Sequence, residues 1–450
     1  MKINKRLSQI QKIGYGVGDA GSNLCWTFIA SFIMIYCTNT LKISAAVIGS
    51  LMMFSKLFDG ITDVIMGRII DATHSKMGKA RFWYFISCFP TALFTYFLFN
   101  VPASFSENTK YVYIFIIYTL IGAVFYTMNN IAYSTLTALC TNNKEDRVQM
   151  GSYRYFFARV AAVLINSFTI YIVNYFGGGQ GGWHMVSLIY SILCVVLLLV
   201  PVFSVKELPE KMLEVNSANN DEIGFLDSIK LLLKNKYFIL MFLLYTVTYV
   251  SEGVSGGMAV YFAKYNLNND AALGPISMAN YIPLIIALPF VSLLTKKMTM
   301  QKASILGHIL GTVGGILIII GGFSGSFSFI LFGIGLKAVG LAPQTGMQNA
   351  IIAEADDYSG LKFGKKTTGT IYSSASVGLK LGSGLGIALT GFLLDFSGFN
   401  GAVFSQSSLA LSTINWSFTL SHALLPMISL IIFLFMDVEK VNSILRKKVK

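Results

Sequence analysis

Long apolar runs recur along the chain, and each is separated from the next by a polar or charged segment. A helix needs about 20 mainly apolar residues to cross the ~30 Å hydrocarbon core of a bilayer. Runs of that length predict twelve membrane-spanning helices, at residues 14–40, 44–71, 82–101, 111–139, 151–175, 184–204, 237–263, 274–294, 303–322, 326–352, 369–395 and 413–437. The pattern therefore predicts an all-α, multi-pass membrane protein.

The composition agrees with this prediction and excludes other broad classes. Of the 450 residues, 54% are hydrophobic and 12% are charged, about half the charged fraction of a soluble globular protein. Such a chain can neither cover a soluble surface nor remain disordered. The 41 glycines suit close helix–helix approach in lipid. The five cysteines lie within or at the ends of apolar runs and show no metal-binding or disulfide spacing.

Basic residues lie mostly in alternate connections. Of the 34 Lys and Arg, most fall in the start, the tail and every second loop, whereas the other loops hold only Lys42, Lys110 and Lys264. Because basic loops stay on the cytoplasmic side, this asymmetry predicts that both termini are cytoplasmic. It also explains most of the formal charge of +13 without a nucleic acid partner.

The predicted spans form two groups of six around one long polar segment. We expect an N-terminal bundle at 1–204, a cytoplasmic linker at 205–236, a C-terminal bundle at 237–438 and a cytoplasmic tail at 439–450. The linker pattern predicts an amphipathic helix near 225–233 on the membrane surface. Two six-helix bundles that rock about a central site are the plan of the major facilitator superfamily. Between the halves, only the basic loops 72–81 and 295–302 correspond visibly.

The second predicted span carries charges at a depth where each costs about 2.5–3.5 kcal/mol on insertion scales. Lys56, Asp59 and Asp63 fall within roughly 60° of one helix face, and Thr62 lies beside Asp59. Two carboxylates one turn apart repel each other unless a metal cation, a proton or a lysine lies between them. The pattern therefore fits a cation site, or alternatively a structural ion pair between Lys56 and Asp59.

The connection after this span is also rich in charge. We interpret Asp71, Lys79 and Arg81 as parts of a gate that latches the two halves together. A plain basic loop would show a similar pattern.

Four stretches of the sequence resemble the glycoside–pentoside–hexuronide:cation symporters, the family of the melibiose and glucuronide permeases. They are GYGVGDAGSN, FDGITDVIMGRIIDATHSKMGKARFW, YTMNNIAYSTL and EADDYSGLKFGKKTTGTIYSSASVGLK. The resemblance covers nearly all of the chain in order, and the paired acids followed by G-x-x-x-D/N-x-T-x-S-x-x-G-K are rare elsewhere. It implies the fold of the major facilitator superfamily and a place in the bacterial cytoplasmic membrane.

The resemblance also implies where the coupling ion binds. The family's cation site falls on Asp59 and Asp63, with Thr62 and Thr127 as oxygen ligands and Lys380 beside it. The two acids would hold the metal ion if the coupling cation is sodium.

The family's sugar site is matched less completely. Its two sugar-gripping acids correspond to Asn23 and Asn130, as in the glucuronide permeases, and Arg154 lies one residue from the family's fifth-span arginine. Trp26, one turn after Asn23, either stacks on the sugar or packs against lipid and core. Because asparagines replace the family's two acids, the sugar site has two fewer negative charges. This predicts that the substrate is an anionic glycoside, such as a glucuronide or another uronide, held by Arg154 or by Lys337 or Lys380. A neutral glycoside or pentoside held by the asparagines is the alternative.

These predictions describe a secondary active transporter that imports a glycoside with Na⁺ or H⁺ and with no other cofactor. An enzyme is not expected, because the four histidines form no motif such as HExxH. No GxxxxGK[ST] motif is present, so neither a nucleotide partner nor ATP as an energy source is expected. A transporter-like sugar sensor without turnover and a uniporter are the alternatives, and the pair of acids argues against the uniporter.

Overall fold

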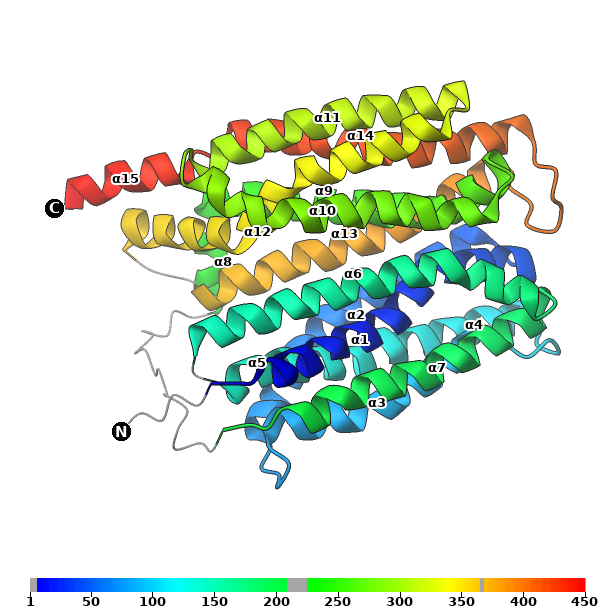
Figure 1. Cartoon of the computed structure of the whole chain (residues 1–450), viewed down its shortest axis with the longest axis horizontal. Helices are drawn as coiled ribbons and strands as arrows, with labels where there is room; N and C mark the ends of the chain where they lie inside the picture. The colour runs from blue at the N-terminus through cyan, green and yellow to red at the C-terminus, as the bar shows by residue number, and fades with distance from the viewer. Residues whose placement is uncertain (1–5, 142, 209–224, 365–367, 450) are drawn as a thin grey trace. The chain divides into compact units, whose positions relative to one another are not determined.

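The computed structural model describes residues 6–141, 143–208, 225–364 and 368–449, and all regular structure in these ranges is helical (Figure 1). Up to residue 208 the helices are α1 (Gln9–Ile35), η1 (Tyr36–Thr40), α2 (Ala45–Ala72), α3 (Lys79–Leu98), α4 (Glu107–Thr119), η2 (Leu120–Tyr126), α5 (Thr127–Cys140), α6 (Lys144–Tyr175) and α7 (Gly179–Ser204). From residue 225 they are α8 (Phe225–Lys234), α9 (Lys236–Tyr261), η4 (Phe262–Asn266), η5 (Asp270–Ala272), α10 (Leu273–Thr295), α11 (Met300–Ser324), α12 (Phe327–Phe363), α13 (Thr368–Phe396), α14 (Ser408–Leu434) and α15 (Val438–Val449).

Within the described ranges, eleven helical stretches are long and apolar enough to cross a membrane. Each matches one predicted span. The remaining predicted span, 82–101, corresponds to α3, which has 20 residues but contains Lys79, Arg81 and Pro90 beside Trp, Tyr, Ser and Thr side chains, and these lower its mean hydropathy. The predicted all-α class is therefore confirmed, and the count of twelve spans is reached when α3 is included.

Three spans that the sequence predicts as plain α-helices contain a π-helical turn. Tyr36–Thr40 ends the first span, Leu120–Tyr126 interrupts the fourth, and Phe262–Asn266 ends the seventh. Such turns often mark functional sites, because they change which side chains face a neighbouring helix. Apolar run length cannot reveal them, since a π-turn uses the same residue types as an α-turn.

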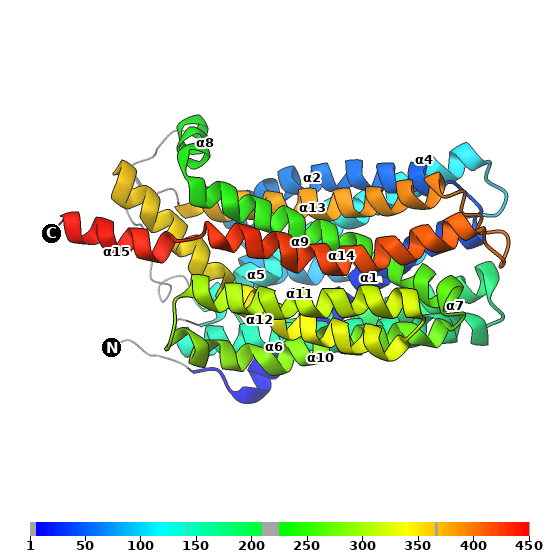
Figure 2. The same ribbon diagram turned by 90° about the horizontal axis from the view of Figure 1, so that it is seen from above.

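The chain divides into two compact units. The first holds residues 1–216, 263–277 and 394–407, and the second holds 217–262, 278–393 and 408–450. Residues 209–224 of the predicted linker lie outside the described residues. The helix predicted near 225–233 is present as α8, and its axis runs across that of α9 (Figure 2).

In the first unit, α1 lies between α6 and α7 (Figure 1). Its aromatic side chains form much of the core there. The ring of Phe28 is stacked on Phe99 with centroids 4.0 Å apart, and it lies 6.3 Å from the ring of Trp183 on α7. Through Phe28 this helix packs against α7 and the end of α3, and it carries polar side chains nearer its start.

In the second unit, α11 lies between α12 and α14 (Figure 2). Glycines bring its backbone close to that of α12. A Cβ added to Gly340 would press on the carbonyl oxygen of Gly307 and lie 2.6 Å from the amide nitrogen of Gly311. In lipid, helices associate through such close packing because hydrophobic burial gives little drive.

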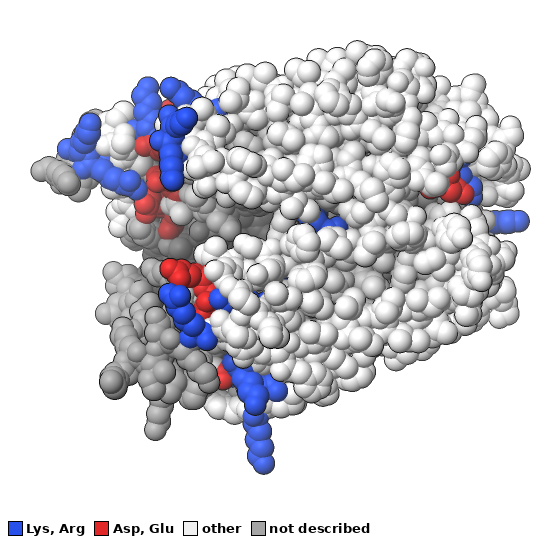
Figure 3. Space-filling view, in the orientation of Figure 1, with Lys and Arg blue, Asp and Glu red and all other residues white. Residues whose placement is uncertain are grey.

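The surface of each unit suits a bilayer. On the face that Figure 3 shows, most charged side chains gather at one end of the helices, a smaller group lies at the other end, and the long side between them is nearly free of charge. Large apolar side chains are exposed on those sides, among them Phe54 and Ile65 of α2 and Phe290 of α10. An apolar surface of this extent requires lipid around it.

We predict that Gly340→Ala destabilises the protein by about 1–3 kcal/mol, because the new methyl group meets backbone atoms of α11 that cannot move aside. Thermal unfolding in detergent measures the effect. Gly256→Ala on α9 is the matched control, since nothing lies within 4 Å of its Cβ position. Equal unfolding temperatures for the two variants would contradict the close packing of α11 and α12.

Candidate functional site

The acidic cluster lies in the first unit, where α2 faces the π-helical turn η2. Lys56 Nζ is 2.8 Å from Asp59 Oδ2, and both side chains are buried. One turn further along α2, Asp63 Oδ1 is 3.1 Å from Thr127 Oγ1, at the junction of η2 and α5. The structure thus pairs Asp63 with Thr127, and one turn earlier on α2 it pairs Asp59 with Lys56.

The π-helical turn supplies a backbone oxygen to the same place. Thr127 Oγ1 is also 3.1 Å from the carbonyl oxygen of Gly122, so its single proton serves only one of two acceptors at a time. Gly122 leaves room beside the ion pair, because a Cβ there would lie 3.4 Å from Asp59 Oδ1 and 3.8 Å from Lys56 Nζ. Carboxylate, hydroxyl and carbonyl oxygens are the ligands that hard cations prefer. Sequence reasoning missed Gly122, whose only signal was a glycine inside an apolar run.

Trp26 of α1 contacts this cluster through Lys56. The Lys56 ammonium lies 3.8 Å from the centroid of the Trp26 ring and 5.8 Å from that of Tyr118. Trp26 also packs against Tyr126 of η2 at 5.0 Å. A cation over an aromatic face is attracted by the ring quadrupole. Trp26 therefore helps to position Lys56. The sequence had suggested only sugar stacking or packing for Trp26, and not this contact.

Thr62 and Lys380 stay predictions as members of the cation site. Thr62 Oγ1 is 3.2 Å from the carbonyl oxygens of Phe58 and Asp59, so its proton is donated within its own helix. Lys380 lies on α13, in the second unit.

A second polar cluster in the first unit joins α1 to α6. Arg154 Nε is 2.7 Å from Asp19 Oδ2, and the guanidinium lies 4.2 Å from the centroid of the Tyr133 ring. Asn23 donates a hydrogen bond from Nδ2 to the carbonyl oxygen of Asp19 at 2.9 Å. The predicted sugar residues Asn23 and Arg154 therefore share one cluster. Its centre is Asp19, which sequence reasoning overlooked although it lies within the GYGVGDAGSN motif.

Asn130 is exposed on α5, whereas its neighbour Asn129 is buried. Asn129 accepts a hydrogen bond from Ser22 of α1 at 3.1 Å and donates one to Ser87 of α3 at 3.0 Å. Asn129 therefore ties three helices together. The assignment of Asn130 to the sugar site stays a prediction.

The predicted gate residues surround a carboxylate that sequence reasoning missed. The backbone N–H groups of Lys79 and Arg81, in the first turn of α3, donate hydrogen bonds to the Glu207 carboxylate at 2.9 and 2.7 Å. A helix N-terminus stabilises such a negative charge. Gly78 has a φ of 105°, and a Cβ there would lie 2.5 Å from Glu207 Cδ, so glycine is required. Asp71 is exposed near the end of α2.

The second unit repeats this arrangement. The backbone N–H of Met300, at the start of α11, donates to Glu439 Oε2 at 2.7 Å, and that of Gln301 lies 3.4 Å from the same oxygen. Glu207 and Glu439 each follow the last long helix of their half and bind the end of a matching basic loop. The observed bonds lie within each unit, and latching of the two halves by Asp71, Lys79 and Arg81 stays a prediction.

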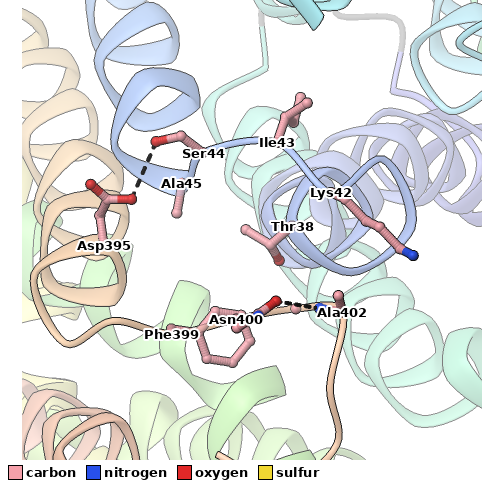
Figure 4. Close-up of a pocket in the computed structure, with 10 residues that line it drawn as sticks. Thr38, Lys42, Ile43, Ser44, Ala45, Asp395, Phe399, Asn400 and Ala402 are labelled. Atoms are coloured by element: carbon pink, nitrogen blue, oxygen red, sulfur yellow. Dashed lines mark hydrogen bonds between the residues drawn. The ribbon is translucent and has the colours of Figure 1, made fainter.

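Two cavities in the first unit lie apart from these clusters. One, of about 200 Å³, is lined by Thr38, Ser44 and Asp395 among others, and Ser44 Oγ donates to Asp395 Oδ1 at 3.3 Å (Figure 4). The other, of about 410 Å³, is lined in part by Lys42 and Lys264, two of the lysines predicted for the outer loops. No predicted cation or sugar residue lines either cavity.

Known proteins match this chain over most of its length. Residues 14–440 match the protein family described as MFS/sugar transport protein. The isoprimeverose transporter of Lactiplantibacillus pentosus is 26% identical over 436 residues, which are 96% of this chain and 89% of the relative. The putative glycoside/cation symporter YagG of Escherichia coli is 24% identical and covers 91% and 87%. A glucuronide carrier protein homologue of Escherichia coli is 22% identical and covers 88% and 86%.

The fold is likewise that of known transporters. A bacterial homologue of the human lysosomal transporter Spinster, in an inward-facing and unoccupied conformation, superposes with a TM-score of 0.68 over 97% of this chain and 99% of that structure. At 14% identity this likeness shows the fold alone. The family match confirms the predicted superfamily and class: the family is one of transporters and not of enzymes. This multi-pass membrane protein belongs to the MFS/sugar transport protein family, the group of glycoside–pentoside–hexuronide:cation symporters that its motifs indicated.

Proposed function

We propose that this protein is a cation-coupled glycoside symporter that works by alternating access. The observation that carries the proposal is the pair of carboxylates on α2 inside the first unit, of which Asp63 lies 3.1 Å from Thr127 Oγ1 and Asp59 lies beside Gly122 of η2. Carboxylates within a membrane bundle are costly, and they mark ion pathways in transport proteins. The names of relatives that are glycoside and isoprimeverose transporters support the substrate class.

Either Na⁺ or H⁺ can serve as the coupling ion at such a site. Sodium would take oxygen ligands from the two carboxylates, Thr127 and the carbonyl of Gly122, whereas a proton would neutralise one carboxylate and end the repulsion between the pair. Both ions therefore act through the same charges on α2. Lys380 is proposed to balance these charges from α13.

Coupling between ion and sugar follows from α1. This helix carries Trp26, which contacts Lys56, and one turn earlier it carries Asn23 of the Asp19–Arg154 cluster. When an ion binds and Lys56 is displaced from Asp59, Trp26 loses its cation and α1 can shift. The sugar would exert the same effect on the ion in return, because coupling of this kind is reciprocal.

For the substrate we favour a neutral glycoside over a uronide, which reverses the preference drawn from Asn23 and Asn130. Asp19 keeps one carboxylate in the cluster, and its partner Arg154 already has a negative charge to bind. A carboxylate and a guanidinium together accept from and donate to sugar hydroxyl groups. A uronide would have to displace Asp19 from Arg154 and would be repelled by it.

The two glutamate contacts support movement of each unit as one body. Glu207 fixes the start of α3 and Glu439 fixes the start of α11, each from a segment that follows the last long helix of its half. With the loops held in this way, each bundle would rock as a rigid body, because the loops at its charged end would not bend.

We predict that Asp59→Asn and Asp63→Asn each abolish cation-driven sugar accumulation, because an amide keeps the volume but removes the charge that binds the ion. Uptake into proteoliposomes with and without a Na⁺ or H⁺ gradient measures this. Asp146→Asn is the matched control, since Asp146 forms another buried pair, with Lys12 at 2.6 Å. It should lower stability and leave the ion dependence unchanged. Uphill uptake in either site variant would refute the cation site, and failure of both to insert would favour a structural ion pair.

Gly122→Ala should fold normally but bind the coupling ion more weakly. The added methyl group would be at ordinary contact distance from Asp59 Oδ1, so it fills space that the ion and its ligands use. We expect the apparent ion affinity to fall by about tenfold, which corresponds to ~1.4 kcal/mol. The ion concentration that gives half-maximal uptake reports it, and an unchanged value would place the ion away from η2.

Asp19→Asn should distinguish the two substrate classes. If the substrate is neutral, the loss of an acceptor lowers uptake of a glucoside and does not create uptake of the matching glucuronide. If it is a uronide, the variant frees Arg154 and removes a repelling charge, so glucuronide uptake should rise. Competition by both sugars in wild type and variant provides the comparison, with Asn23→Asp as the opposite change in charge.

A further inference from the structure

A buried lysine and histidine face each other in the second unit, on α12 and α14, and the lysine is Lys337, named above as a possible partner of a substrate carboxylate. Lys337 of α12 and His422 of α14 are only 4% and 5% exposed. Lys337 Nζ lies 3.5 Å from His422 Nδ1, at the outer limit of a hydrogen bond. The pair thus consists of two nitrogen bases without an intervening acid.

The pair lies deep within its predicted spans. Lys337 is near the middle of the span predicted at 326–352, about 17 Å from its start at a rise of 1.5 Å per residue, close to the centre of a ~30 Å core. Among the residues that the structure describes, no carboxylate lies within 4 Å of its Nζ. An ammonium group at this depth is costly, so its presence there points to a function.

The surrounding helices offer few other ionisable groups. From α9 the acid is Glu252, which is exposed and outside ion-pair distance. From α11 the only ionisable side chain within the apolar stretch is His308, whose ring stacks on Phe433 with centroids 5.2 Å apart. His422 is the only such residue of α14. Among the described residues, His422 is therefore the ionisable side chain in contact with Lys337, and Glu252 acts on it only from a longer distance.

Backbone packing fixes Lys337 at this level. A Cβ added to Gly314 of α11 would lie 2.7 Å from the Lys337 amide nitrogen, so the two backbones touch there. On the other side of α11, a Cβ on Gly315 would lie 2.6 Å from Ala423 Cα, next to His422. The glycines of α11 thus hold α12 and α14 at the spacing that brings the two nitrogen atoms together.

We propose that Lys337 and His422 form a proton-binding site in the middle of the second unit, separate from the acidic cation site of the first. The ammonium of Lys337 donates one proton towards His422 Nδ1, or the imidazolium donates it to the amine, and a second proton from solvent makes both groups cationic and repelling. Burial of both side chains leaves no room for a sugar carboxylate between them. The pair would make transport respond to pH even when Na⁺ is the coupling ion.

Solid-state NMR of the full chain with ¹⁵N-labelled histidine in lipid vesicles tests the site without any transport. Only four histidines are present, so the signal of His422 is identified by its loss in His422→Gln. We expect it to titrate between about pH 5 and 8. In Lys337→Met the midpoint should move to higher pH by about one unit or more, because the repelling ammonium is gone. His308→Gln, the matched control, should leave the titration unchanged.

A wild-type His422 signal, assigned by its loss in His422→Gln, that does not change over this range would overturn the proposal. An unchanged midpoint in Lys337→Met, or in Lys337→Gln if the first variant does not fold, would overturn it equally. A pH profile of uptake gives the functional readout: it should shift in Lys337→Met and stay as in wild type in His308→Gln. Because the NMR titration does not depend on sugar or Na⁺, its outcome stands whether or not the proposed symport is correct.

Discussion

A charge inside a bilayer requires a partner within the protein, and the rest of this structure depends on how that requirement is met. Within the predicted spans of the first unit, Lys56 faces Asp59 at 2.8 Å and Arg154 faces Asp19 at 2.7 Å, and outside them Lys12 faces Asp146 at 2.6 Å. Each ion pair joins two helices or two turns of one helix. It also fixes the place where a small ion or a sugar hydroxyl can compete for one of the paired charges. Lys337 in the second unit meets the requirement differently, because the side chain it faces is a histidine and not an acid.

The helix that links these pairs is α1. It begins at a capping box formed by Ser8 and Gln11. Its Lys12 and Asp19 form ion pairs with Asp146 and Arg154 of α6. Its Trp26 contacts Lys56 of α2. Its other face packs through aromatic rings on α7. A displacement of α1 therefore changes both polar clusters at once, which is the physical basis of the coupling proposed above.

The similarity between the two halves is clearer in their hydrogen bonds than in their amino-acid sequences. Each half places a glutamate after its last long helix, and each glutamate accepts backbone hydrogen bonds at the start of the helix that follows a basic loop. In the first half the loop needs Gly78 at positive φ to admit the carboxylate, whereas in the second half Thr299 caps the same helix end. The two halves thus bind a glutamate at a helix start with different residues, so their sequences show little similarity.

The sequence by itself determined the features that depend on neighbours along the chain. Run length predicted the spans, and helical periodicity placed Lys56, Asp59 and Asp63 on one face, where Lys56 and Asp59 do form an ion pair three residues apart. Only the tertiary structure decided the other partners, because Asp19 and Arg154 are 135 residues apart, and Lys337 and His422 are 85 apart. Hydrophobic pattern records which face of a helix is buried but not which distant helix it meets. It also cannot distinguish the π-turn at Leu120–Tyr126 from an α-turn, although that turn brings Gly122 and Thr127 to the acids.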